Sequence, residues 1–262
     1  MANLLFRNTA SRKGRTVSIT PATSPFQLLS CGRIVLDADV PRVAAQNIGA
    51  ETTLVCLHGE GRVTVDDVSY DISRFDGVYV PRGARFTVET ERGIDIAEAS
   101  APVSRATEPA VARYRDIANS PNLTLHVGAE PYYRDIHKIL CENVPGLRIL
   151  AGVTMSKPGN WTSWPPHEHA ATREELYQFF DMPAPGFATQ YVYHDVANPE
   201  FVTNVFNDDA VAIASGYHPN VAAPGYPVNF CWALCALEEE TWRTLANVNV
   251  QPGFETMPTG LR

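Results

Sequence analysis

Two histidines separated by one residue, His167 and His169, begin the stretch of this chain that is best suited to chemistry. They lie in "SWPPHEHAATREELYQFF", residues 163–180, and an adjacent pair of carboxylates, Glu174 and Glu175, follows them. Alternate residues of a strand project to the same side, so the two imidazoles are expected to converge on one point. The strand after them points Glu174 and Glu175 to opposite faces, and a short hairpin through "AATR" can bring either one alongside the imidazoles.

A third imidazole is available from His218, in the turn "ASGYHP". Three neutral imidazoles and a carboxylate suit a divalent metal ion, namely Zn, Mn, Fe or Ni with Zn preferred, and they leave positions open for water or substrate. An isolated pair of histidines at this spacing is more often two surface residues. The acidic pair ahead of an apolar strand and the later histidine in a glycine turn favour metal binding here.

Many short strands must position these residues. Runs rich in Val, Ile, Thr, Phe and Tyr alternate with turns, and 20 prolines and 17 glycines interrupt any long helix. One plan of strand, tight turn and strand occurs at 52–90 and again at 175–195 and 208–237. This weak repeat predicts an all-β chain of two barrels, with a single large sandwich as the alternative.

A segment rich in Ala, Pro, Ser and charge, residues 101–122, is typical of a linker between the two halves. We place the boundary near Asn119, which gives domains at 1–118 and 119–262. Helices are expected only in "PAVARYRDIA", residues 109–118, and in "EEETWRTLANV", residues 238–248.

The composition restricts the class of partner and the compartment. A net charge of -8 and a pI near 5.4 argue against nucleic acid or an anionic membrane. The five cysteines are odd in number and scattered in apolar runs, which indicates buried free thiols in the cytoplasm. No run of eighteen apolar residues is present, and the first six residues do not form a signal peptide. A small acidic sugar is the expected partner, and a homo-oligomer is possible.

The order HxH, four or five residues, Glu and a later Gly-x-His resembles the two motifs of the cupin superfamily, whose fold is a small double-sheet β-barrel. More narrowly, "KPGNWTSWPPHEHA", "EELYQFF", "GFATQYVYHD" and "GYHPNVAAPGY" resemble signature stretches of the 5-deoxy-glucuronate isomerase family, whose members carry two cupin domains in one chain. "FFDMP" is similar to the related 5-keto-4-deoxyuronate isomerase. The resemblance implies that His167, His169, Glu175 and His218 bind the metal, although Glu174 fits the shorter cupin spacing.

The resemblance also implies a reaction. An aldose–ketose isomerase converts 5-deoxy-glucuronate to 2-deoxy-5-keto-gluconate in inositol catabolism through an ene-diolate, whose charge a metal ion can stabilise. The alternatives are a 5-keto-4-deoxyuronate isomerase, a cupin dioxygenase with Fe, and a non-catalytic sugar-binding cupin. The N-terminal half lacks an HxH pair and has Phe86 near the position of the second-motif histidine. It is therefore expected to be structural.

Further candidates lie beside the ligands. A catalytic base is sought among Glu174, Tyr177, Tyr193 and His194, since each has a suitable proton-transfer group. Residues expected to contact the substrate are Arg173 for its carboxylate, Trp164, Gln190 and Tyr191; where related isomerases carry Arg after this Gln, the present chain has Tyr191.

Overall fold

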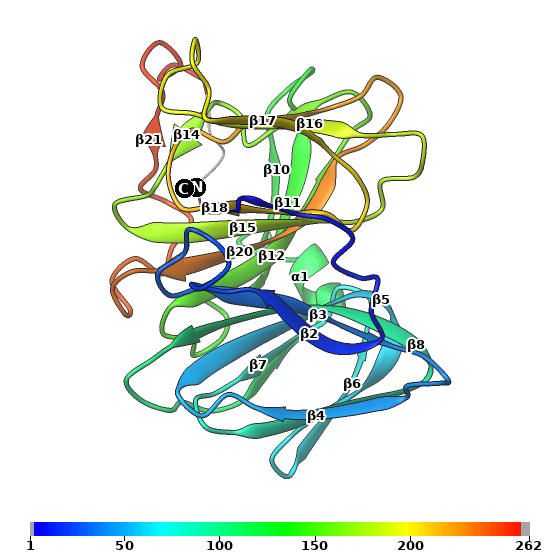
Figure 1. The fold of residues 1–262 in the computed structure, drawn as a ribbon. Helices are drawn as coiled ribbons and strands as arrows, with labels where there is room; N and C mark the ends of the chain where they lie inside the picture. Colours follow the sequence, from blue (N-terminus) through cyan, green and yellow to red (C-terminus); the bar gives the residue numbers. More distant parts are fainter. Residues whose placement is uncertain (1–2, 258–262) are drawn as a thin grey trace.

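The computed structural model describes residues 3–257, and the regular secondary structure among them is almost entirely β-strand (Figure 1). The described elements are β1 (Leu5–Phe6), β2 (Gly14–Ile19), β3 (Ser30–Leu36), β4 (Arg42–Gln46), β5 (Ala50–Val65), β6 (Val68–Ser73), β7 (Gly77–Val80), β8 (Arg85–Pro102), β9 (Ala110–Ala112), α1 (Tyr114–Ala118), β10 (Thr124–Val127), β11 (Arg134–Leu140), β12 (Ile149–Ser156), β13 (Trp161–Thr162), β14 (His167–Glu168), β15 (Arg173–Phe179), β16 (Ala188–Val192), β17 (Phe201–Val205), β18 (Ala210–Ile213), β19 (Asn220–Ala222), β20 (Asn229–Ala236) and β21 (Asn249–Val250). The predicted all-β class is confirmed.

The N-terminal sheet, blue to cyan in Figure 1, has the order β2-β3-β8-β5-β7-β9, with β4 paired to β8 and β6 to β5. The long strands β5 and β8 curve along each other, and their alternate apolar side chains fill the interior. Phe86 is part of this apolar core and is 1% exposed. The interior of this barrel is therefore packed with hydrocarbon at the level of Phe86.

The C-terminal half consists of a seven-stranded sheet, in the order β1-β18-β15-β20-β12-β11-β10, and a four-stranded sheet, β13-β19-β16-β17. Strand β15 is central, with β18 on one side and β20 on the other. The first strand of the chain crosses over to this half, where Leu5 pairs with Val211. The division at residue 118 stays a prediction.

The two halves pack back to back through a shared core. Apolar side chains from β3, β5 and β8 interleave with those of β12, β15 and β20. Glu51 of the first half is buried there, and it accepts hydrogen bonds from the backbone N–H groups of Leu147, Arg148 and Ile149. This carboxylate ties the start of β12 to the N-terminal half.

Helix is even scarcer than expected. Only Tyr114–Ala118 of the stretch 109–118 is helical, because Ala110–Ala112 pairs with β7 as strand β9. The helix expected at 238–248 was wrong: these residues form turns and irregular backbone that ends at β21. No described helix has the length and hydrophobicity that crossing a membrane requires. The predicted buried free thiols are confirmed for all five cysteines.

Candidate metal centre

Three donor atoms converge inside the C-terminal barrel. The Nε2 atoms of His169 and His218 lie 3.0 and 3.1 Å from Oε2 of Glu175. The three side chains could together hold one metal ion, and each is buried. Ligand atoms about 2.1 Å from a common ion lie roughly 3 Å from each other when they are neighbours, so these separations suit shared ligation.

Backbone carbonyls fix the orientation of the rings. The Nδ1 atom of His218 lies 2.8 Å from the carbonyl oxygen of Gly216, and that of His169 lies 3.3 Å from the carbonyl oxygen of Arg173. A carbonyl oxygen can only accept, so Nδ1 carries the hydrogen and Nε2 of the neutral ring presents its lone pair to Glu175. The buried Nε2 of His218 has no hydrogen-bond partner of acceptable geometry. Lone pairs and a carboxylate at such short range repel each other unless a cation lies among them, and the donor set therefore fits a metal ion.

His167 lies beside these three side chains. Its ring centroid lies 5.1 Å from that of His218, and its Nδ1 faces the carbonyl oxygen of Pro165 at 2.8 Å. Nδ1 therefore carries the hydrogen here as well, and Nε2 presents the lone pair that could bind a metal ion. Burial, reinforced by the neighbouring imidazole of His218, lowers the pKa of His167 to about 3. Burial alone raises the pKa of Glu175, yet the imidazoles of His169 and His218 outweigh burial and hold that pKa well below its usual range. At neutral pH His167 is therefore uncharged and Glu175 is ionised, the protonation states in which each can bind a metal ion.

Glu174 faces away from this centre. It lies on the opposite face of β15, where its carboxylate accepts hydrogen bonds from the backbone N–H groups of Gln27, Leu28 and Leu29. The strand alternates, so that Glu175 points into the barrel while Glu174 points to the N-terminal half. The geometry contradicts Glu174 as ligand or base, because its carboxylate is buried among these backbone donors.

Tyr177 follows Glu175 on the inward face. Its ring centroid is 5.9 Å from that of His218, and its hydroxyl lies 2.7 Å from Oγ of Ser163. Burial, together with the charge of Glu175, raises the pKa of Tyr177 well above its usual value. The phenol is therefore protonated at neutral pH and can donate a hydrogen bond into the site.

The other two predicted bases lie elsewhere. His194 is 61% exposed at its side chain, and its Nδ1 is 2.8 Å from Oε1 of Glu200 on the surface. Tyr193 donates its hydroxyl hydrogen to Oε1 of Gln251 at 2.8 Å, and burial raises its pKa to about 12. The geometry gives neither side chain a position against the donor cluster.

The residues predicted to contact substrate hold the backbone or pack against other aromatic rings. The guanidinium of Arg173 donates to the carbonyl oxygens of Thr244, Ala246 and Asn247, which follow β20 in the chain. Gln190 is buried and donates to the carbonyl oxygen of His218 at 3.0 Å. In this position it fixes the turn that carries a ligand.

Trp164 and Tyr191 belong to an aromatic group outside the donor cluster. The ring of Trp161 lies 4.9 Å from Trp164 and stacks on Tyr191 at 6.0 Å between centroids. Trp164 also meets Phe254 edge to face, with centroids 5.2 Å apart. Contact of either ring with substrate stays a prediction.

A small cavity adjoins the ligands. Its volume is about 60 Å³. Its wall is formed by Arg134, Ile136, Thr154, Ser163, His167, His169, Arg173, Glu175, Tyr177, Phe230, Trp232, Leu234, Leu245 and Val248.

Sequence analysis missed Arg134, a guanidinium that is 2% exposed inside this wall. Burial lowers its pKa to about 10, which still leaves it charged at neutral pH. The sequence did contain a signal for it. In "YYRDIHKIL" Arg134 and Ile136 are two residues apart, so their side chains share one face of the strand, and an arginine therefore lies on the apolar face.

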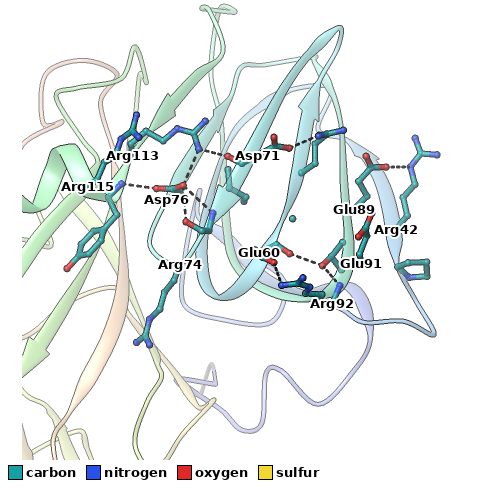
Figure 2. A pocket seen from close by; sticks show the side chains of 17 residues that line it. Arg42, Glu60, Asp71, Arg74, Asp76, Glu89, Glu91, Arg92, Arg113 and Arg115 are labelled. Carbon is teal, nitrogen blue, oxygen red and sulfur yellow. Dashed lines mark hydrogen bonds and ion pairs between the residues drawn. The ribbon is translucent and has the colours of Figure 1, made fainter.

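A larger hollow of about 1150 Å³ lies in the N-terminal half (Figure 2). Its lining is charged and largely self-neutralised, and neither histidine nor cysteine occurs among the residues that line it. Within it the ion pairs are Arg62 with Asp71 at 2.7 Å, Arg113 with Asp76 at 3.1 Å, Arg92 with Glu60 at 3.2 Å and Arg42 with Glu89 at 3.8 Å. Two of the three candidate metal ligands, His169 and Glu175, line the smaller cavity, so cavity size is a poor guide to the site here.

A family model described as KduI/IolB matches residues 4–251 of this chain. The chain belongs to the KduI/IolB family. It is 29% identical over 233 residues to the 5-deoxy-glucuronate isomerase of Geobacillus kaustophilus (strain HTA426), with 82% of each chain covered. The 5-deoxy-glucuronate isomerase of Lacticaseibacillus casei is 30% identical over 194 residues, covering 67% of this chain and 70% of that one. This KduI/IolB-family chain is therefore an enzyme of the isomerase class, and the predicted intramolecular oxidoreductase is confirmed.

Solved structures agree on the fold. An IolB-like protein from Salmonella typhimurium LT2 superimposes with a TM-score of 0.83 at 24% identity, covering 97% of this chain and 98% of that one. A variant of Bacillus subtilis oxalate decarboxylase gives a TM-score of 0.63 at 16% identity, covering 90% and 80%. The predicted cupin architecture is confirmed. Another structure of the same decarboxylase describes Mn(II) centres in that enzyme.

Proposed function

We propose that this chain is a metal-dependent aldose–ketose isomerase that converts 5-deoxy-glucuronate to 2-deoxy-5-keto-gluconate. The observation that carries the proposal is the convergence of buried imidazole and carboxylate donors in a barrel of the KduI/IolB family. Relatives named 5-deoxy-glucuronate isomerase support the choice of substrate.

The residues assigned to the ion are His167, His169, Glu175 and His218. A divalent ion in this donor set, whether Zn, Mn, Fe or Ni, supplies stabilisation of the negative charge that develops when a proton leaves the carbon beside a carbonyl group, worth several kcal/mol. The carbonyls of Pro165 and Gly216 keep the donor nitrogens turned inward.

Two further side chains on the cavity wall suit the substrate. Arg134 provides a positive charge beside the donor cluster, and a guanidinium binds a carboxylate through paired hydrogen bonds. Tyr177 keeps its proton at neutral pH and can donate a hydrogen bond to an oxygen that becomes negative. We assign the substrate carboxylate to Arg134, whose buried guanidinium lines the cavity and also donates from Nη1 to the carbonyl oxygen of Tyr132 at 3.2 Å. Arg173 donates to three backbone carbonyls, and we assign it a structural role.

The test is incubation of the metal-replete protein with 5-deoxy-glucuronate, and separately with 5-keto-4-deoxyuronate, while NMR follows the conversion of each. We expect turnover of the first substrate, with loss of activity after chelation and in His218→Ala. A protein that keeps full activity after complete metal removal would refute the metal-dependent reaction. Turnover of the second substrate alone would replace the assigned sugar, and oxygen consumption would indicate a dioxygenase.

A further inference from the structure

The cavity beside the ligands is too small for the substrate. Its volume of about 60 Å³ has room for a metal ion and a few waters. Pockets for small organic ligands measure roughly 300–1,000 Å³. A six-carbon sugar acid can enter only if part of the wall moves, and this requirement rests on the proposed function.

One part of the wall differs in construction from the rest. Leu245 and Val248 line the cavity from the irregular segment after β20, whereas much of the remaining wall comes from strands of the barrel. These two side chains are only partly buried. The segment pairs with the rest of the chain through the two-residue strand β21, where Val250 faces His167. It therefore has few backbone contacts to break on opening.

Side chains that sequence analysis assigned to the substrate, Arg173 and Trp164, or to catalysis, Tyr193, hold this segment. Arg173 donates to the carbonyl oxygens of Thr244, Ala246 and Asn247. Tyr193 reaches Gln251, and Trp164 packs on Phe254. Three separate points of the barrel rim thus attach to one stretch, residues 244–254.

We infer that residues 244–254 are a lid that opens to admit the sugar acid and closes over it. Arg173 is a positioning residue that latches the closed lid, because it is 1% exposed and three lid carbonyls accept hydrogen bonds from its guanidinium. Closure brings Leu245 and Val248 over the donor cluster and sets β21 beside β14, the strand that begins with His167. A closed lid excludes water from the negatively charged intermediate.

A reversible lock tests the movement. Glu168 and Asn249 are paired across β14 and β21, so the double variant Glu168→Cys/Asn249→Cys places two cysteines at a separation that a disulfide can span. The five native cysteines are buried and should not compete. We expect the oxidised protein to turn over substrate at least about tenfold more slowly than the reduced protein, at equal metal content. Equal rates in both forms would overturn the lid.

Hydrogen exchange tests the latch without any substrate. The amide of Ala246 donates to Oγ1 of Thr244, and that of Gln251 donates to the carbonyl oxygen of Pro166. In Arg173→Gln we expect these lid amides to exchange at least about tenfold faster than in the unsubstituted protein. Unchanged exchange would refute the latch.

Arg148 offers a matched control, since it also donates to backbone carbonyls, those of Ala236 and Leu237, just before the lid. Arg148→Gln should leave exchange at 244–254 unchanged, and an equal rise in both variants would show general loosening and contradict a specific latch. If the unsubstituted protein acts on neither uronate while the exchange results hold, the lid stands and the assigned reaction fails.

Discussion

Glu174 and Glu175 are neighbours in the chain, yet they are expected to respond to the same substitution in opposite ways. The carboxylate of Glu174 accepts hydrogen bonds from three backbone N–H groups where the two halves of the molecule meet, and Glu175 faces two imidazoles inside the barrel. In Glu174→Gln one acceptor oxygen is replaced by an amide that faces backbone donors. A hydrogen bond to a charged group contributes about 1.5–3 kcal/mol, so we expect the free energy of unfolding to fall by about 3 kcal/mol. For a chain of this size that lowers the Tm by roughly 6–12 °C.

Glu175→Gln removes a charged ligand and should affect the folded state little by comparison. We expect metal content to fall well below one ion per chain and activity to fall at least a hundredfold. Loss of a side chain that only orients a metal ligand lowers affinity or activity by up to roughly a hundredfold, and loss of a ligand itself should cost at least as much. Metal analysis and thermal denaturation of both variants, measured side by side, give the comparison. The reasoning is refuted if Glu174→Gln loses the metal while Glu175→Gln keeps it.

Three more predictions follow from the cavity wall and the core. Tyr177→Phe should lower kcat by roughly a hundredfold with metal content unchanged, as loss of one donor to a developing negative oxygen does, and an unaltered kcat would remove the phenol from the reaction. Arg134→Met should raise KM for the sugar acid by roughly 10–150-fold, from the 1.5–3 kcal/mol of a charged hydrogen bond, while Arg134→Lys recovers part of the loss in steady-state assays. Burial lowers the pKa of His137 below its usual 6.5, so the unfolded chain takes up a proton that the folded chain excludes. The free energy of unfolding should therefore decrease as the pH falls below about 6.5, and urea titrations of His137→Gln should show a smaller decrease.

The sequence indicates the ligand-bearing strand correctly because its signal is local. Period-two alternation places Glu175, Tyr177 and Phe179 on one face of β15, and the structure has that alternation from Arg173 to Phe179. Alternation along a strand does not show which of its two faces points into the barrel, and Glu174 is also buried, on the opposite face of β15. The resemblance to cupins, together with the approach of Gln27–Leu29 from the first half, separates the two carboxylates.

The rest of the site depends on contacts between residues distant in the chain, which spacing does not reveal. Residues 238–248 have a helical composition, but the carbonyl oxygens of Thr244, Ala246 and Asn247 accept hydrogen bonds from Arg173, and the segment forms turns and irregular backbone. Arg134 was overlooked because a single arginine beside apolar residues gives a weak signal until the cavity is known. His194 was included because its imidazole can transfer a proton, whereas its ring lies on the surface against Glu200.

The central claim is that one metal ion is bound among these donors. The most direct measurement is a crystal structure of the metal-loaded protein with anomalous diffraction recorded at the absorption edge of the bound element. The account predicts one anomalous peak about 2.0–2.3 Å from the Nε2 atoms of His167, His169 and His218 and from a carboxylate oxygen of Glu175. The absence of a peak there, or a peak only in the arginine-lined hollow of the N-terminal half, would contradict it.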